Sequence, residues 1–87
     1  MNDQWFINFR KKLDQHYSWP ALYVFKFIVP KSKALEVKAL FPKHTPFGKP
    51  SKNGNYVSVT VEMMIPSSEA VIKIYQSASK IEGIIAL

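Results

Sequence analysis

The stretch that decides the fold is 21–29, which has the sequence ALYVFKFIV. Aromatic and β-branched residues with a single charge, Lys26, are typical of a strand. Side chains alternate along a strand, so its two faces differ. The bulkier face, which we expect to lie against a layer of helices, carries Tyr23, Phe25, Phe27 and Val29. The other face, which is expected to be less buried, carries Leu22, Val24, Lys26 and Ile28.

A second long strand is predicted over 56–64, where apolar and polar residues alternate. One face, expected to point toward the helices, carries Val57, Val59, Val61 and Met63. The face expected to point away carries Tyr56, Ser58, Thr60 and Glu62. This pattern indicates a strand with one buried side.

The segment before that strand, 45–51, contains two prolines, which lack the backbone N–H that a central strand needs. Residues four apart point their backbone groups to the same side, so Pro46 and Pro50 can both face outward. We therefore predict an edge strand. We expect the turn to be a three-residue loop, 52–54, with Gly54 left-handed in a bulge, because this register leaves Pro50 free of a ladder hydrogen bond.

An amphipathic helix is predicted at the N-terminus, over 3–16, with Asn2 or Asp3 as its cap. Apolar side chains recur there at four-residue spacing, at Trp5, Phe9 and Leu13. Such a helix is marginal in isolation, so its aromatic stripe must pack against something. We favour an arrangement in which it folds back over the open face of its own sheet, with a homodimer as the alternative.

Two further helices and a short strand complete the chain. A short helix fits over 31–40, with Leu35 and Ala39, and with Ala34 and Leu40 as further candidates, in its apolar stripe. A longer helix begins after a serine cap at 67–68 and ends near residue 81. Its expected buried stripe is Val71, Ile74, Tyr75, Ala78 and Ile81. Gly83 breaks this helix, and 84–87 is a terminal strand.

The order of elements is therefore one helix followed by β-α-β-β-α-β. Two β-α-β halves with right-handed crossovers interleave into one four-stranded antiparallel sheet with helices on one face. The first and third strands are central. This is the ferredoxin-like plait, an α+β fold, and we divide the chain into an N-terminal amphipathic helix over 1–18 and the plait domain over 19–87.

Length and composition bound the function. A chain of 87 residues makes one small domain, and its 47% hydrophobic content is that of a folded protein. The absence of cysteine excludes disulfides and thiolate metal sites. No apolar run approaches the length of a membrane span, and the N-terminus has no signal-peptide pattern. We expect a cytoplasmic protein whose formal charge of +6 permits an acidic partner.

Two motifs resemble those of a known family. The sequence WPALYVFK at 19–26 resembles the opening strand of the YbeD-like small bacterial proteins. The sequence KPSKNGNYVS at 49–58 resembles the hairpin of the same family. Some members of this family are labelled lipoate regulatory proteins. The resemblance extends from residue 19 to residue 87. It implies a fold similar to that of ACT regulatory domains, which bind small effectors at subunit interfaces. The segment between Lys26 and Lys49 is shorter here than in that family.

No catalytic motif is present. The two histidines, His16 and His44, stand in no nucleophile motif, and the six acidic residues are spread singly along the chain. We therefore expect a protein that is not an enzyme and that has no metal or cofactor. The hypothesis is a regulatory or interaction module that binds a small effector or a partner protein. The candidate binding residues are Lys26, Lys49, Ser51, Lys52, Asn55, Tyr56 and Ser58.

Two other interpretations remain open. The candidate residues can be purely structural, with Asn53 and Gly54 forming the turn and Lys26 pairing with Glu62. The alternative function is weak binding of RNA or another polyanion. Its basis is a basic stretch with one acid, Glu36, and the lysines Lys31, Lys33, Lys38, Lys43, Lys49 and Lys52.

Overall fold

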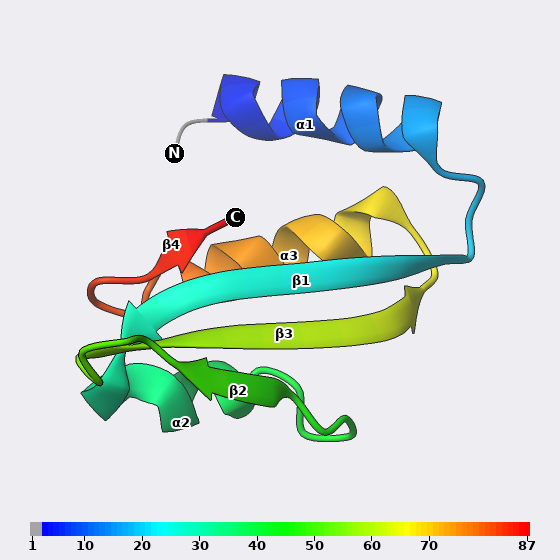
Figure 1. The fold of residues 1–87 in the computed structure, drawn as a ribbon. Coiled ribbons are helices and arrows are strands. Elements are labelled where there is room, and N and C mark those ends of the chain that lie inside the picture. The colour runs from blue at the N-terminus through cyan, green and yellow to red at the C-terminus, as the bar shows by residue number, and fades with distance from the viewer. Residues whose placement is uncertain (1–2) are drawn as a thin grey trace.

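The computed structural model of the protein describes residues 3–87, except the side chain of Asp3. The predicted cap at Asn2 or Asp3 therefore lies outside the described side chains. Figure 1 shows an N-terminal helix, a sheet and two further helices. In chain order the elements are α1 (Asp3–His16), β1 (Ala21–Pro30), the 3-10 helix η1 (Lys31–Lys33), α2 (Ala34–Lys38), β2 (Phe47–Pro50), β3 (Tyr56–Ile65), α3 (Ser68–Ala78) and β4 (Ile85–Ala86).

The four strands form one antiparallel sheet in the order β2-β3-β1-β4. β1 and β3 are central and pair along ten residues, from Ala21↔Ile65 to Pro30↔Tyr56. β2 lies at one edge and the two-residue β4 at the other (Figure 1). This strand order and element order confirm the predicted ferredoxin-like plait with an additional N-terminal helix.

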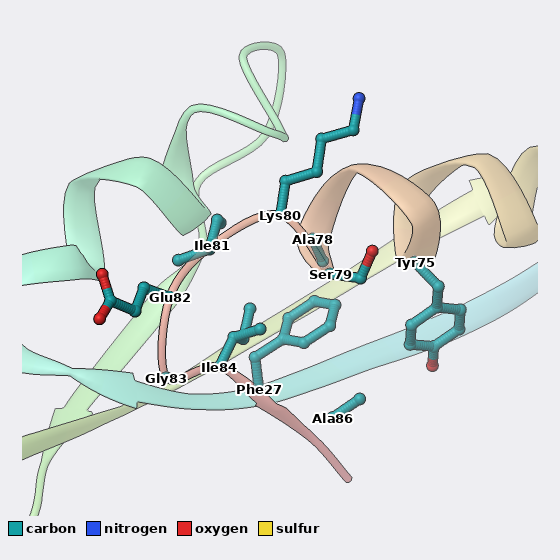
Figure 2. A pocket seen from close by; sticks show the side chains of 10 residues that line it. All are labelled: Phe27, Tyr75, Ala78, Ser79, Lys80, Ile81, Glu82, Gly83, Ile84 and Ala86. Atoms are coloured by element: carbon teal, nitrogen blue, oxygen red, sulfur yellow. The ribbon is translucent and has the colours of Figure 1, made fainter. Parts of the chain in front are cut away.

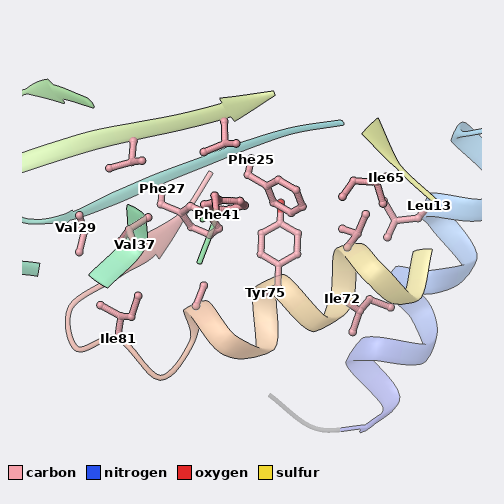
Figure 3. Packing of buried hydrophobic residues seen from close by; sticks show 14 residues of the cluster. Leu13, Phe25, Phe27, Val29, Val37, Phe41, Ile65, Ile72, Tyr75 and Ile81 are labelled. Atoms are coloured by element: carbon pink, nitrogen blue, oxygen red, sulfur yellow. The ribbon is translucent and has the colours of Figure 1, made fainter. Parts of the chain in front are cut away.

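The hydrophobic core lies between the central strands and the helices, as the alternation of side chains predicts. Phe25, Phe27 and Val59 are fully buried on the inner face of the sheet. Figure 3 shows Tyr75 pointing from α3 toward Phe25, and the two ring centroids are 5.4 Å apart. Together with Phe41, these rings form an aromatic centre that joins the sheet to the helical layer.

α3 begins as predicted, because the Ser67 hydroxyl accepts a hydrogen bond from the Ala70 N–H at 3.2 Å. Its buried side includes the predicted Val71, Tyr75 and Ala78 and also Ile72, which the predicted stripe omitted. The helix ends at Ala78, and residue Ile81, predicted to be in the same stripe, is buried just beyond it.

The β2–β3 hairpin differs from the prediction in the length of its loop. The Ser51 N–H donates to the Tyr56 carbonyl at 2.8 Å, so the loop has four residues, 52–55, and not three. Gly54 is left-handed as predicted, with φ +75°. Hydrogen-bonded and non-hydrogen-bonded pairs alternate along an antiparallel ladder. Because Ser51 and Tyr56 form a hydrogen-bonded pair, the next pair, Pro50 and Val57, is non-hydrogen-bonded, and Pro50 needs no N–H, as predicted.

The first plait helix presents a partly different face from the one predicted, because Ala34 and Leu40 pack against the core but the other two members of the predicted stripe do not. Leu35, assigned to the apolar stripe, is the most exposed large apolar side chain described, at 79%, and Ala39 is also exposed. Val37 is fully buried instead. The physical reason is that the segment begins as a 3-10 turn over Lys31–Lys33, which rotates the following α-helical turn relative to a continuous α-helix.

α1 has the predicted length, but it does not cover the open face of the sheet. It packs against α3, where the ring centroids of Phe9 and Tyr75 are 5.5 Å apart and Arg10 and Glu69 form an ion pair of 3.4 Å. Leu13 completes this contact in the core. The interior between α1 and α3 offers apolar side chains to both helices, whereas the far side of the sheet would have to bury a lysine, Lys26.

Replacing Leu13 tests this docking of α1. Leu13→Ala should lower the free energy of unfolding by about 2–4 kcal/mol, because it removes a buried side chain from the α1–α3 contact. Ile7→Ala is the matched control on the exposed side of the same helix and should change stability by less than about 0.5 kcal/mol. Urea unfolding followed by circular dichroism measures both. Equal effects would contradict the observed orientation of α1.

The two left-handed glycines provide a second test. Gly83 has φ +79°, and a Cβ there would lie 2.8 Å from Pro30 Cγ, whereas a Cβ at Gly54 would meet nothing within 4 Å. Gly54→Ala should therefore cost only the backbone strain, about 1–2 kcal/mol. Gly83→Ala should cost more because β4 must also shift away from β1. Thermal and urea unfolding of the two variants should rank them in this order.

Candidate functional site

The candidate site is the side of the sheet that carries no helix, which we call the open face. Ten large apolar side chains are exposed among the described residues, and six of them lie on this face. They are Leu22, Val24, Phe47, Tyr56, Met64 and Ile85. With each about half exposed, they present roughly 500 Å² of apolar surface, near the upper range for a small monomer.

Strand register gathers most of the predicted candidate residues on the open face. Lys49 on β2 lies opposite Ser58 on β3. Lys26 on β1 lies opposite Thr60, which is the next residue of β3 on the same face. Tyr56 faces the same side at the end of β3 and is 47% exposed. Four of the seven candidates therefore share one surface, although they are far apart in sequence.

The other three candidates belong to the turn beside that surface. The Ser51 hydroxyl accepts a hydrogen bond from the Tyr56 N–H at 3.2 Å, and the Asn55 carbonyl accepts one from the Lys31 N–H at 3.0 Å. Lys52 is exposed in the loop. Ser51 and Asn55 thus have a structural role in closing the hairpin. Lys52, in the same turn, adds a positive charge next to the open face.

The electrostatics of the open face are basic. The ion pairs among the described residues are Arg10–Glu69 and Lys33–Glu36, so the proposed pairing of Lys26 with Glu62 is wrong. The reason is register: Glu62 lies opposite Val24, diagonal to the lysine. Among the described residues, Lys26 and Lys49 consequently project from this surface without forming an ion pair.

The basic stretch of the sequence does not form one surface. Lys31, Lys33 and Lys38 belong to η1 and α2 on the helical side, where the Lys38 amine reaches β2 at Gly48, whereas the Lys49 side chain lies on the open side of β2. Lys33 is already paired with Glu36 at 3.2 Å. The fold therefore divides these charges between the helical side and the edge of the sheet.

Two cavities lie elsewhere in the molecule. One, of about 350 Å³, lies between the end of α3 and β4, with Phe27, Tyr75 and Ile84 in its wall. Figure 2 shows Lys80 directed away from it. The other, of about 440 Å³, lies between α1 and β1. None of the seven candidate residues lines either cavity, so the structure does not bring them together around an enclosed ligand.

Each cavity has one member of a pair of tyrosines in its wall, Tyr75 in the first and Tyr23 in the second. The Tyr23 and Tyr75 hydroxyl oxygens are 3.0 Å apart. Burial raises the pKa of both phenols, most strongly that of Tyr75. Both side chains are therefore neutral hydrogen-bonding groups in the folded protein at physiological pH.

The tyrosine pair should make the protein sensitive to alkali. Because the folded-state pKa of each phenol is raised, the neutral pair contributes stability below about pH 10, and that contribution is lost as pH rises further. Tyr75→Phe should lose about 1 kcal/mol at neutral pH but show a shallower decline above about pH 10. Urea unfolding across this pH range measures the difference, and parallel pH profiles would contradict it.

The described residues hold no cluster of three or more His, Cys, Asp or Glu side chains suited to a metal ion. His16 is exposed at the end of α1, and His44 is exposed in the loop before β2. No helix in this part of the chain combines the length and apolar character needed to cross a membrane.

Sequence reasoning missed part of the open face. Met64 continues the outward alternation of β3 beyond Glu62, so this position was available from the pattern. Ile85 was not, because the direction of its side chain depends on how β4 aligns with β1.

Comparison with known proteins identifies relatives of the same size. The chain is 31% identical over 80 residues to a UPF0250 protein of Shewanella piezotolerans, an alignment that covers 84% of this chain and 91% of the relative. It is also 31% identical over 78 residues to a UPF0250 protein of Shewanella amazonensis, covering 82% and 89%. No solved structure matches.

The family model DUF493, described as a protein of unknown function, matches residues 14–87. This match covers the whole plait, including both motifs from which the YbeD-like resemblance was inferred. The resemblance is thereby confirmed, and the chain belongs to the DUF493 family.

Proposed function

We propose that the protein is a non-enzymatic interaction module that binds an acidic partner protein through the open face of its sheet. The observation that carries this proposal is the concentration of exposed apolar side chains there, six of the ten described. Isolated apolar side chains on a surface are ordinary, but this number of exposed apolar side chains on one face, interspersed with polar residues, is typical of protein interfaces.

The charge of the protein selects the class of partner. The chain carries +6 overall, and the open face has two lysines, Lys26 and Lys49, against one acid, Glu62. A second copy would bring another +6 into contact, which opposes association. A partner with acidic side chains around an apolar centre would instead pair with the lysines while covering Val24 and Phe47.

The shape of the site supports a macromolecular partner over a small effector. Small ligands bind in concave pockets that bury most of their surface. The candidate residues lie on a sheet face and on the turn next to it, outside the two cavities. A flat apolar surface with lysines among and beside its apolar side chains matches the usual plan of a protein interface, an apolar centre with a polar rim.

Variants of the open face test the proposal. Val24→Ser and Phe47→Ser remove exposed apolar groups without entering the core, and Leu35→Ser on α2 is a matched exposed control. Tagged full-length proteins are used to capture partners from a lysate of the source organism, and captured proteins are identified by mass spectrometry. A purified acidic partner should bind the wild type and Leu35→Ser alike, and each face variant about tenfold more weakly.

Three outcomes would contradict the proposal. The first is equal binding of all variants to the captured partner. The second is a concentration-dependent dimer in sedimentation experiments that Val24→Ser dissociates, which would make a second copy the occupant. The third is salt-sensitive binding of polyuridine RNA that Phe47→Ser abolishes, because the exposed aromatics Phe47 and Tyr56 would then act as base-stacking platforms.

A further inference from the structure

The two edges of the sheet are protected very differently. β2 is four residues long, contains Pro50 and Lys49, and follows Pro46, all of which discourage the addition of another strand. On the other edge, β4 pairs with β1 only at Phe27 and Ile28. The rest of that edge, 21–25, carries neither proline nor charge. A long bare edge of this kind invites strand addition.

Hydrogen-bond geometry identifies the free groups on this edge. The Lys26 carbonyl accepts a hydrogen bond from the Leu87 N–H at 2.9 Å, so the even-numbered residues of β1 direct their N–H and C=O groups toward β4. Leu22 and Val24 therefore direct theirs to the same side. Within residues 3–87, no backbone group is hydrogen-bonded to either of them there.

A ready-made space lies next to these groups. Figure 1 shows α1 and α3 on the same side of β1 as β4. The cavity of about 440 Å³ is an open groove that connects α1 with Tyr23 of β1, and its wall is formed by Phe9, Lys12, Leu13, His16, Tyr17 and Tyr23. A strand added along 21–25 would alternate its side chains between this cavity and the open face, beside Leu22 and Val24.

The chemistry of this space indicates the sequence that would enter it. Phe9 and Leu13 offer an apolar wall to side chains that point toward the helices. Lys12 and His16 are the ionisable groups of α1 in that wall. Lys26 is the first residue after the bare edge, because its carbonyl is already bonded to the Leu87 N–H. Asp14, the acid on this part of α1, already accepts a hydrogen bond from Trp19 Nε1 at 2.8 Å.

We infer that the free edge of β1 binds an extended, acidic and apolar segment of a partner protein, which adds to the sheet as a further strand between β1 and α1. Main-chain hydrogen bonds to Leu22 and Val24 supply the affinity, and the cavity at Tyr23 selects a large apolar side chain. The inference goes beyond the proposed function, because the edge can accept a strand whether or not the open face has a partner.

A defined peptide tests the inference on the full chain. The probe is the capped peptide Thr-Asp-Val-Phe-Val-Asp-Thr. Its phenylalanine and both aspartates point toward the cavity with Lys12 and His16, and its two valines point toward the open face. Amide exchange is followed by NMR. Saturating peptide should slow exchange at Leu22 and Val24 by about tenfold or more, whereas Tyr23 and Phe25, already bonded to β3, should change little.

Matched controls separate strand addition from unspecific binding. The same peptide N-methylated at both valines cannot complete the ladder and should not bind. Lys12→Glu should weaken binding several-fold, whereas Lys43→Glu, in the loop before β2, should not. Phe47→Ser should leave peptide binding intact, so failure at the edge can be distinguished from failure of the open-face proposal.

The inference is overturned by any of three results. One is the absence of binding up to millimolar peptide. Another is equal binding of the N-methylated peptide, which would show that the backbone of β1 is not used. The last is protection of Leu22 and Val24 that rises with protein concentration alone, which would assign the edge to a second copy of the chain.

Discussion

β1 and β3 pair along ten residues, and this register fixes the direction of every side chain on the two central strands. It places Phe25 and Phe27 against Tyr75 of α3, which is the aromatic centre of the core. The same register puts Val24 and Lys26 on the opposite side. A one-residue slip would exchange the two sets and bury the lysine. The core and the open face are therefore two consequences of a single pairing.

The helical layer explains why the open face stays uncovered. α1 has an apolar stripe and could in principle have covered either side of the sheet. It lies against α3 because that contact buries Leu13 and brings Phe9 to Tyr75, while Arg10 reaches Glu69. All helices thus share one side, and exposed apolar groups such as Val24 and Met64 concentrate on the other.

The candidate residues of the sequence motifs divide into two roles. Ser51 and Asn55 hold the hairpin through hydrogen bonds to Tyr56 and Lys31, which explains the motif in structural terms. Lys26, Lys49 and Tyr56 project from the open face, where no such structural contact is recorded. The family model is described as a protein of unknown function, and the features of this chain that favour binding are its exposed surface and its charge.

Local patterns determined the order of the elements, the two faces of β1 and β3 and the cap of α3, because alternation and capping depend on neighbours in sequence. They also predicted an edge strand at Pro50. Only the tertiary structure decided the side on which α1 packs, the burial of Val37 in place of Leu35 and the outward position of Ile85. Each of these depends on how distant segments compete for the same apolar surface, which no local spacing encodes.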